Sequence, residues 1–266
     1  MNPRSLMLNA YVYAVLAFVM IPILVILPMA FSDTSYLTFP PRGFSLRWFQ
    51  EFFTNGRWMA AAGFSFAIAF LVAIVTAVLG TMATYAMVRG GGKLASLFQA
   101  ALVLPIIVPH IALAVALYLF FQRIGLTGTI WAYVLAHSVI AMPFTVFTIA
   151  AALSRIDPAL ENAAMSCGAT RFNAFRLVTL PNILPNVLSG ALFAFIISFD
   201  EPVITYFLAG TRDKTLPRLM FEDIQMNITP ILAAIAVLLT ALSVIVLLAA
   251  AALRRLSQNR AAITVE

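Results

Sequence analysis

The chain has 266 residues and a net charge of +6, and 63% of its residues are hydrophobic while only 10% are charged. Soluble domains are about 45–50% apolar and about 25% charged, so this composition excludes an ordinary water-soluble enzyme or binding module. It also excludes a nucleic-acid-binding protein, because the polar segments contain no basic stripe with interleaved aromatic residues.

Six long uncharged runs predict an all-α protein, a single transmembrane domain over residues 1–266 with six membrane-spanning helices. Each run has the roughly 20 apolar residues needed to cross a hydrocarbon core about 30 Å thick. Continuous apolar runs also exclude a membrane barrel, whose strands alternate. The first run is too long for the apolar region of a cleaved signal peptide, so we expect it to stay as a signal anchor. The expected spans are residues 8–31, 59–88, 94–121, 130–153, 183–208 and 230–253.

The distribution of basic residues predicts that both termini lie in the cytoplasm. In that orientation the inner side has nine basic residues and three acids, and the outer side has seven basic residues and five acids. A surplus of Lys and Arg on the cytoplasmic side is the usual sign of membrane topology. The net positive charge is therefore attributed to topology.

The loop between the fourth and fifth expected spans, residues 155–181, departs most from the apolar background. Asp157 is a good N-cap, and Pro158 follows it at the first helical position. Gly168 supplies the left-handed residue that ends a helix. A second amphipathic piece begins at Thr170, and Pro181 marks the return to the membrane. The pattern predicts two short helices that meet at a bend.

The spacing in this loop resembles the signature of the type I ABC importer permeases: E-A-A, three residues, G, nine residues, I-x-L-P. The chain has Asn162-Ala163-Ala164, Gly168 and Val178-Thr179-Leu180-Pro181 at those positions. Asn162 replaces the glutamate, and Glu161 stands one place earlier, which turns a helical side chain by about 100°. The resemblance implies a coupling helix that docks in a groove of a cytoplasmic ATPase. Its expected residues are Asp157, Glu161, Asn162, Ala163, Ala164, Gly168, Leu180 and Pro181.

The same resemblance implies a permease subunit with no catalytic residue, no metal and no cofactor of its own. ATP and Mg would be bound by two separate ATPase subunits. Six spans form half of a translocation path, so a second permease subunit, expected to be a different chain, and a periplasmic solute-binding protein would complete the importer. The implied location is the lipid of a bacterial inner membrane. Gly90-Gly91-Gly92-Lys93 lacks the spacing of a phosphate loop.

Two segments are similar to those of the spermidine/putrescine permeases: Ser45–Phe53 and Ser198–Gly210. They favour a polyamine or a related amine-bearing solute. Permeases for phosphonate, ferric iron and thiamine share much of this frame and remain alternatives, as does an amino-bearing zwitterion or an anion. An ion-coupled secondary transporter would need coupling acids near the midplane and usually an inverted repeat, neither of which we find in the sequence. A membrane scaffold would leave the loop motif unexplained.

Four residues are candidates for a substrate pathway. Asp200 and Glu201 are the only acids inside an expected span, where an ionisable residue is costly and indicates function. Pro202 follows them and predicts a broken helix. His110 lies inside the third expected span, and Tyr206 lies in the fifth. Aromatic rings attract ammonium groups, so acids and an aromatic ring together would suit a cation.

Each of these candidates also has a structural explanation. The two acids would equally serve in a salt bridge to a neighbouring subunit or near the water interface. A stripe of Phe195, Phe199 and Tyr206 is typical of helix packing, and His110 is able to donate to a backbone carbonyl. His137, inside the fourth expected span, is interpreted as a packing residue with a local hydrogen bond.

Overall fold

The computed structural model describes residues 3–208, 214–226 and 228–263. Within these ranges the regular elements are helices, which turns and loops connect, and one isolated bridge joins Ser32 and Phe44. Two compact units are present. Unit 1 comprises Met1–Ala60 and Met220–Leu242, and unit 2 comprises Ala61–Leu219 and Ser243–Glu266.

Among the described residues, five helices are long and apolar enough to cross a membrane, and the number is six if a bent pair of helices counts as one span. This confirms the predicted all-α membrane fold. The fourth expected span, residues 130–153, coincides with α6. The five helices are α1 (Pro3–Ala30), α3 (Gly56–Gly90), α6 (Ile130–Leu153), α9 (Leu180–Phe199) and α12 (Pro230–Ile263). Helical turns from Arg171 to Thr179 come directly before α9.

The third expected span, residues 94–121, is not one continuous helix. It consists of α4 (Gly92–Ile107) and α5 (His110–Arg123), which are bent by 110°. Val108 and Pro109 have extended backbones between them, with ψ of 133° and 130°. Proline lacks an N–H and disfavours helical geometry in the residue before it. The composition of the expected span did not predict this bend, because α4 and α5 are both apolar.

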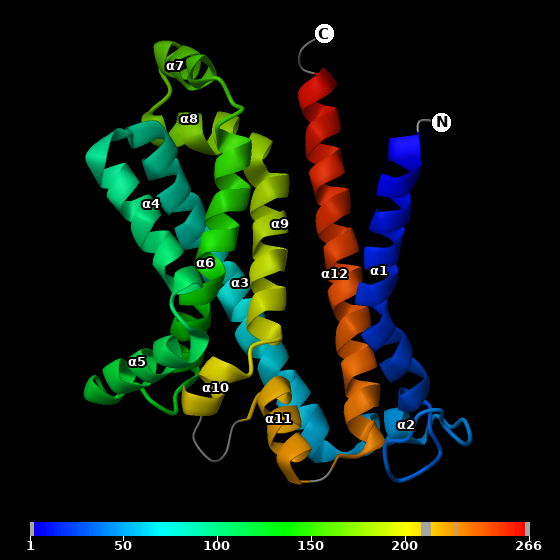
Figure 1. The fold of residues 1–266 in the computed structure, drawn as a ribbon. Helices are drawn as coiled ribbons and strands as arrows, with labels where there is room; N and C mark the ends of the chain where they lie inside the picture. Colours follow the sequence, from blue (N-terminus) through cyan, green and yellow to red (C-terminus); the bar gives the residue numbers. More distant parts are fainter. Residues whose placement is uncertain (1–2, 209–213, 227, 264–266) are drawn as a thin grey trace. The chain divides into compact units, whose positions relative to one another are not determined.

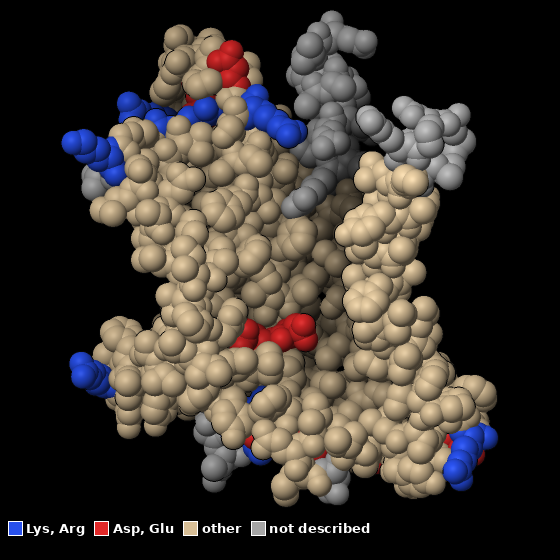
Figure 2. Space-filling view, in the orientation of Figure 1, with Lys and Arg blue, Asp and Glu red and all other residues tan. Residues whose placement is uncertain are grey.

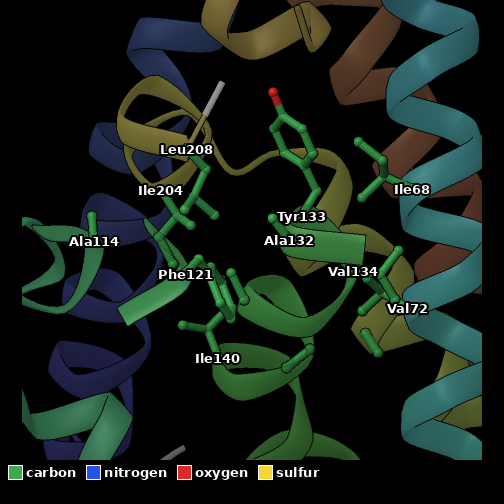
Figure 3. Close-up of a cluster of buried hydrophobic side chains, with 13 residues drawn as sticks. Ile68, Val72, Ala114, Phe121, Ala132, Tyr133, Val134, Ile140, Ile204 and Leu208 are labelled. Atoms are coloured by element: carbon green, nitrogen blue, oxygen red, sulfur yellow. The ribbon is translucent and has the colours of Figure 1, made fainter. Parts of the chain in front are cut away.

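The core of unit 2 surrounds α6, as Figure 3 shows. Tyr133 and Ile140 of α6 pack with Ile68 of α3, Phe121 of α5 and Ile204 of α10 (Val203–Leu208). A helix that is hydrophobic all round is buried. The composition of α6 therefore accounts for its central position in this unit.

Small residues bring three helices of unit 2 close together at Thr145 of α6. A Cβ added to Gly190 of α9 would lie 3.2 Å from the Thr145 Cα, and one added to Gly80 of α3 would lie 3.1 Å from Cγ2. Thr145 Oγ1 also donates to the Gly190 carbonyl at 3.2 Å. Small residues allow this close approach of membrane helices.

The two ends of unit 2 differ in chemistry. Short helices α7 (Pro158–Ser166) and α8 (Arg171–Ala174) lie at one end of α6 and α9, and α5 and α10 lie at the other (Figure 1). Basic side chains gather near α7 and α8 in Figure 2. Exposed arginines at this end are Arg155, Arg171 and Arg176.

Unit 1 contains α1, α2 (Arg47–Thr54), the start of α3, most of α11 (Leu216–Met226) and the start of α12. Arg57 Nη2 lies 2.8 Å from Asp223 Oδ1 and joins the start of α3 to α11. Trp48, Phe52 and Trp58 are buried.

Candidate functional site

The loop helix α7 begins with a complete N-terminal cap. The Asp157 carboxylate accepts a hydrogen bond from the Ala159 N–H at 2.8 Å. Pro158 occupies the first turn, where its missing N–H leaves no donor unpaired. The predicted start of this helix is confirmed.

Gly168 ends α7, as the sequence predicts. Its φ is +94°, a conformation that L side chains rarely adopt. The Ala169 N–H then donates to the Ala164 carbonyl at 3.1 Å. Thr170 Oγ1 accepts from the Asn173 N–H at 3.2 Å and begins the second helix.

The second loop helix continues directly into the fifth span. After α8 comes a π-helical segment, Phe175–Thr179, in which the Leu180 N–H donates to the Phe175 carbonyl five residues earlier. Pro181 lies in the first turn of α9, where proline is tolerated. π-helical turns inside α-helices are frequent at functional sites.

Glu161 points from α7 toward the end of α3 and is buried, with 9% of its side chain exposed. Its carboxylate accepts from Tyr85 Oη and Thr179 Oγ1, both at 2.7 Å, and from Arg89 Nε at 3.0 Å. Arg89 Nη2 also donates to the Ile156 carbonyl at 3.1 Å. We call Tyr85, Arg89, Glu161 and Thr179 the Glu161 cluster.

The cluster keeps Glu161 ionised. Burial acts to raise the pKa of its carboxyl, but hydrogen bonds from Tyr85 and Thr179, together with the charge and hydrogen bond of Arg89, outweigh burial and lower the pKa. The carboxylate is therefore a permanent acceptor at neutral pH.

The outer face of α7 is open. Asn162 and Ala163 are exposed and Ala164 is half-buried, so a partner would approach the helix backbone closely. A cavity of about 230 Å³ lies on the other side of α7, where Tyr85, Arg89 and Glu161 of the Glu161 cluster line it together with Arg171 of α8. Of the remaining motif residues, Leu180 is half-buried and Pro181 is exposed.

Two helix interruptions meet elsewhere in unit 2. One is the bend at 108–109, and the other lies between α9 and α10 at residues 200–202, where the sequence predicts a broken helix. His110 Nε2 lies 3.7 Å from Glu201 Oε2. The structure thus brings together two of the four residues expected along a substrate pathway.

Glu201 also has a structural role that the sequence analysis did not predict. Its residue is only 7% exposed, and Oε1 accepts from the Val203 N–H at 2.8 Å and the Ile204 N–H at 2.9 Å. Glu201 is the N-terminal cap of α10, a position where a carboxylate stabilises the helix.

Asp200 and Tyr206 are exposed, in contrast to Glu201. Acidic atoms reach the surface at the level of the α9–α10 break in Figure 2. The Arg218 guanidinium lies 5.8 Å from the centre of the Tyr206 ring. Asp200 is therefore the exposed carboxylate of this break, and Glu201 is the buried one.

Phe195, Phe199 and His137 agree with the structural explanations, whereas Tyr206 lies on α10 beyond the helix break, is exposed and does not continue the stripe. Phe195 and Phe199 are buried and stacked, with ring centres 5.5 Å apart. His137 is fully buried, and its Nδ1 lies 2.8 Å from Ser198 Oγ. The histidine is a packing residue, but its partner lies on α9 rather than nearby in the sequence. Among the described residues, no three His, Cys, Asp or Glu side chains gather to hold a metal ion.

Sequence reasoning missed Tyr85, Arg89 and Thr179. A signal existed for the first two, because they are four residues apart and so share a face of the predicted helix. In the sequence analysis Arg89 counts only as one of the basic residues on the cytoplasmic side. Thr179 carried no signal, because a π-helical segment was not foreseen.

Comparisons with known proteins identify the family of the chain. A family model described as "Binding-protein-dependent transport system inner membrane component" matches residues 76–258. The spermidine/putrescine transport system permease protein PotC of Haemophilus influenzae is 30% identical over 90% of this chain and 93% of that protein. The putrescine transport system permease protein PotI of Escherichia coli K12 is 33% identical over 84% of this chain and 81% of that protein.

A similar fold occurs in a solved structure. It is the crystal structure of a bacterial alginate ABC transporter in complex with an alginate pentasaccharide-bound periplasmic protein. The TM-score is 0.65 with 17% identity, over 96% of both chains.

Proposed function

The chain belongs to the family of binding-protein-dependent transport system inner membrane components, the permease subunits of ABC importers, and from this premise we propose that a separate ATPase drives it and that a polyamine crosses it. Putrescine and spermidine are the solutes we expect, because relatives over most of the chain are named for them. The chain would contribute half of the pathway and no catalytic residue.

The geometry of α7 is the observation that supports ATP-driven coupling. One face of this helix is held against α3 by Glu161, and the other face offers Asn162 and Ala163. A groove in an ATPase would fit an open helix face of small side chains at the basic end of the unit. Closure of two ATPase subunits would then displace α7.

The other expected subunits follow from this role. Two ATPases would bind ATP and Mg, a second and different permease chain would complete the pathway, and a periplasmic binding protein would deliver the solute. We place the chain in a bacterial inner membrane with both termini in the cytoplasm, because basic residues are in surplus on the α7 side.

For the solute, we propose that Asp200 faces the pathway. It is exposed beside a helix break, and a carboxylate at such a break would attract an ammonium group. Glu201 and His110 would support this region, and Tyr206 would add an aromatic ring. A phosphonate, ferric iron or thiamine is the alternative solute. The ATPase would drive its import in the same way, and other residues would line the pathway.

The test of coupling uses Ala163→Trp, which places a bulky ring on the open face of α7. We expect the tagged variant to lose its ATPase subunits on purification and its ATP-dependent uptake of labelled putrescine and spermidine. The matched control is Ala116→Trp, at an exposed residue of α5, which lies at the other end of unit 2 from α7.

Uptake and ATPase retention at wild-type levels in Ala163→Trp would remove the docking proposal. ATPase retention together with uptake of neither polyamine by the wild-type importer would instead contradict the choice of solute. The two parts of the proposal are therefore tested separately.

A further inference from the structure

The Glu161 cluster joins three parts of the chain that are distant in sequence. Tyr85 and Arg89 lie on α3, Glu161 lies in the first turn of α7, and Thr179 ends the π-helical segment before α9. One carboxylate therefore links the loop helix to the ends of two membrane helices.

The link to α3 is double. Arg89 bonds the Glu161 carboxylate through Nε, and its Nη2 bonds the carbonyl of Ile156, which precedes the cap of α7. The Arg89 side chain is 15% exposed. A guanidinium and a carboxylate form one of the stronger and more directional pairs in proteins. The start of α7 is thus fixed to α3 on two sides.

The π-helical segment completes the link to α9. Thr179 is fully buried against Glu161, and the Phe175 ring packs edge-on against the Tyr85 ring at 4.9 Å. The extra residue of a π turn rotates the following residues by about 100° relative to an uninterrupted α-helix. Without this extra residue, Thr179 would face a different direction.

These contacts assign a role to Glu161 that differs from contact with an ATPase. We infer that Glu161 is a positioning residue that transmits the displacement of α7 to α3 and to the start of α9. Asn162 and Ala163 on the open face remain for the partner. The inference rests on the proposed function, because it requires an ATPase that moves α7.

The test uses the assembled importer, purified through a tag on this chain, with ATP and vanadate to trap the ATPase. Hydrogen exchange is measured in α7 and in residues 85–90. In the wild type we expect trapping to slow exchange about tenfold in both segments. In Glu161→Gln and in Arg89→Gln, only α7 should respond. The control is Arg123→Gln, an exposed arginine in the last turn of α5 at the other end of unit 2, which should behave as the wild type.

The double variant tests whether the pair acts as a unit. If it does, Glu161→Gln with Arg89→Gln should lose no more response at residues 85–90 than either single variant. Should the charge variants fail to fold, Tyr85→Phe and Thr179→Val each remove one hydroxyl donor and keep the ion pair. These milder variants should give a partial loss of response at residues 85–90.

Several outcomes would overturn the inference. Wild-type slowing at residues 85–90 in Glu161→Gln would show that the cluster transmits nothing. Loss of the ATPase from that variant would make Glu161 a docking contact instead. Absence of the ATPase from the wild-type complex would contradict the proposed function itself, and this result is distinct from the other two.

Discussion

Glu161 is buried and charged, and the hydrogen-bond donors around its carboxylate determine the pH at which it is protonated. Because the pKa of its carboxyl is lowered from the ordinary value of 4.5, the stability that the cluster gives is fully present above pH 4.5. It is lost only as the pH falls through the lowered pKa. The attachment of α7 should therefore survive mild acidification.

An infrared titration tests this expectation. The difference spectrum between the wild type and Glu161→Gln isolates the carboxylate band of Glu161, and we expect its protonation midpoint below pH 4.5. Asp157→Asn, which changes an exposed acid for another good cap, should leave that band in place. A midpoint at or above 4.5 would contradict the lowered pKa.

For single residues, the sequence predicted the features that depend on near neighbours in the chain. Asp157, Pro158 and Gly168 were predicted correctly, because caps and left-handed positions depend on a few neighbouring residues. The direction of Glu161 depends on Arg89, which is 72 residues away. No local rule gives such a pairing.

Among the elements, α10 depends on a cap from the residue that also faces His110. Glu201→Ala removes the acceptor for two N–H groups and should lower the free energy of unfolding by about 1–2 kcal/mol. Glu201→Gln keeps a side-chain oxygen and should cost less. Thermal unfolding of the purified protein measures both variants.

Asp200 supplies the comparison within the same helix break. Asp200→Asn should leave the unfolding temperature near that of the wild type, because Asp200 is exposed, and should reduce polyamine uptake. Equal loss of stability in Asp200→Asn and Glu201→Ala would contradict the assignment of the cap to Glu201.

Proline marked one helix interruption in advance and not the other. Pro202 directly follows the acids Asp200 and Glu201, and it predicted the break after α9. Pro109 lies between two apolar halves, and the 110° angle between α4 and α5 depends on packing with α10 in the Ala114, Phe121, Ile204 and Leu208 cluster. Periodicity within one run of sequence contains no information about such an angle.

For the whole molecule, the orientation in the membrane is open to a direct test. Cys167 is the sole cysteine of the sequence and is exposed next to α7. A membrane-impermeant maleimide should label it in inside-out vesicles from cells that express this chain alone, and not in intact cells. Ser35→Cys on a Cys167→Ser background is the control and should be labelled from outside. Labelling of Cys167 in intact cells would reverse the topology.

At the same scale, composition alone predicted an all-α membrane protein, and the motif spacing predicted the family. Hydropathy is a strong signal because a span must satisfy its backbone within itself. The division into two units did not follow from the sequence, because α3, α11 and α12 each have residues in both units and no linker separates them.

The close approach at Thr145 limits how unit 2 is able to change shape. A side chain at Gly80 or Gly190 would have to displace Thr145, so α3 and α9 pack tightly against α6 at this point. These three helices would then rock as one solid block. Turning would be left to the joints at residues 108–109 and 200–202, where His110 and Glu201 face each other.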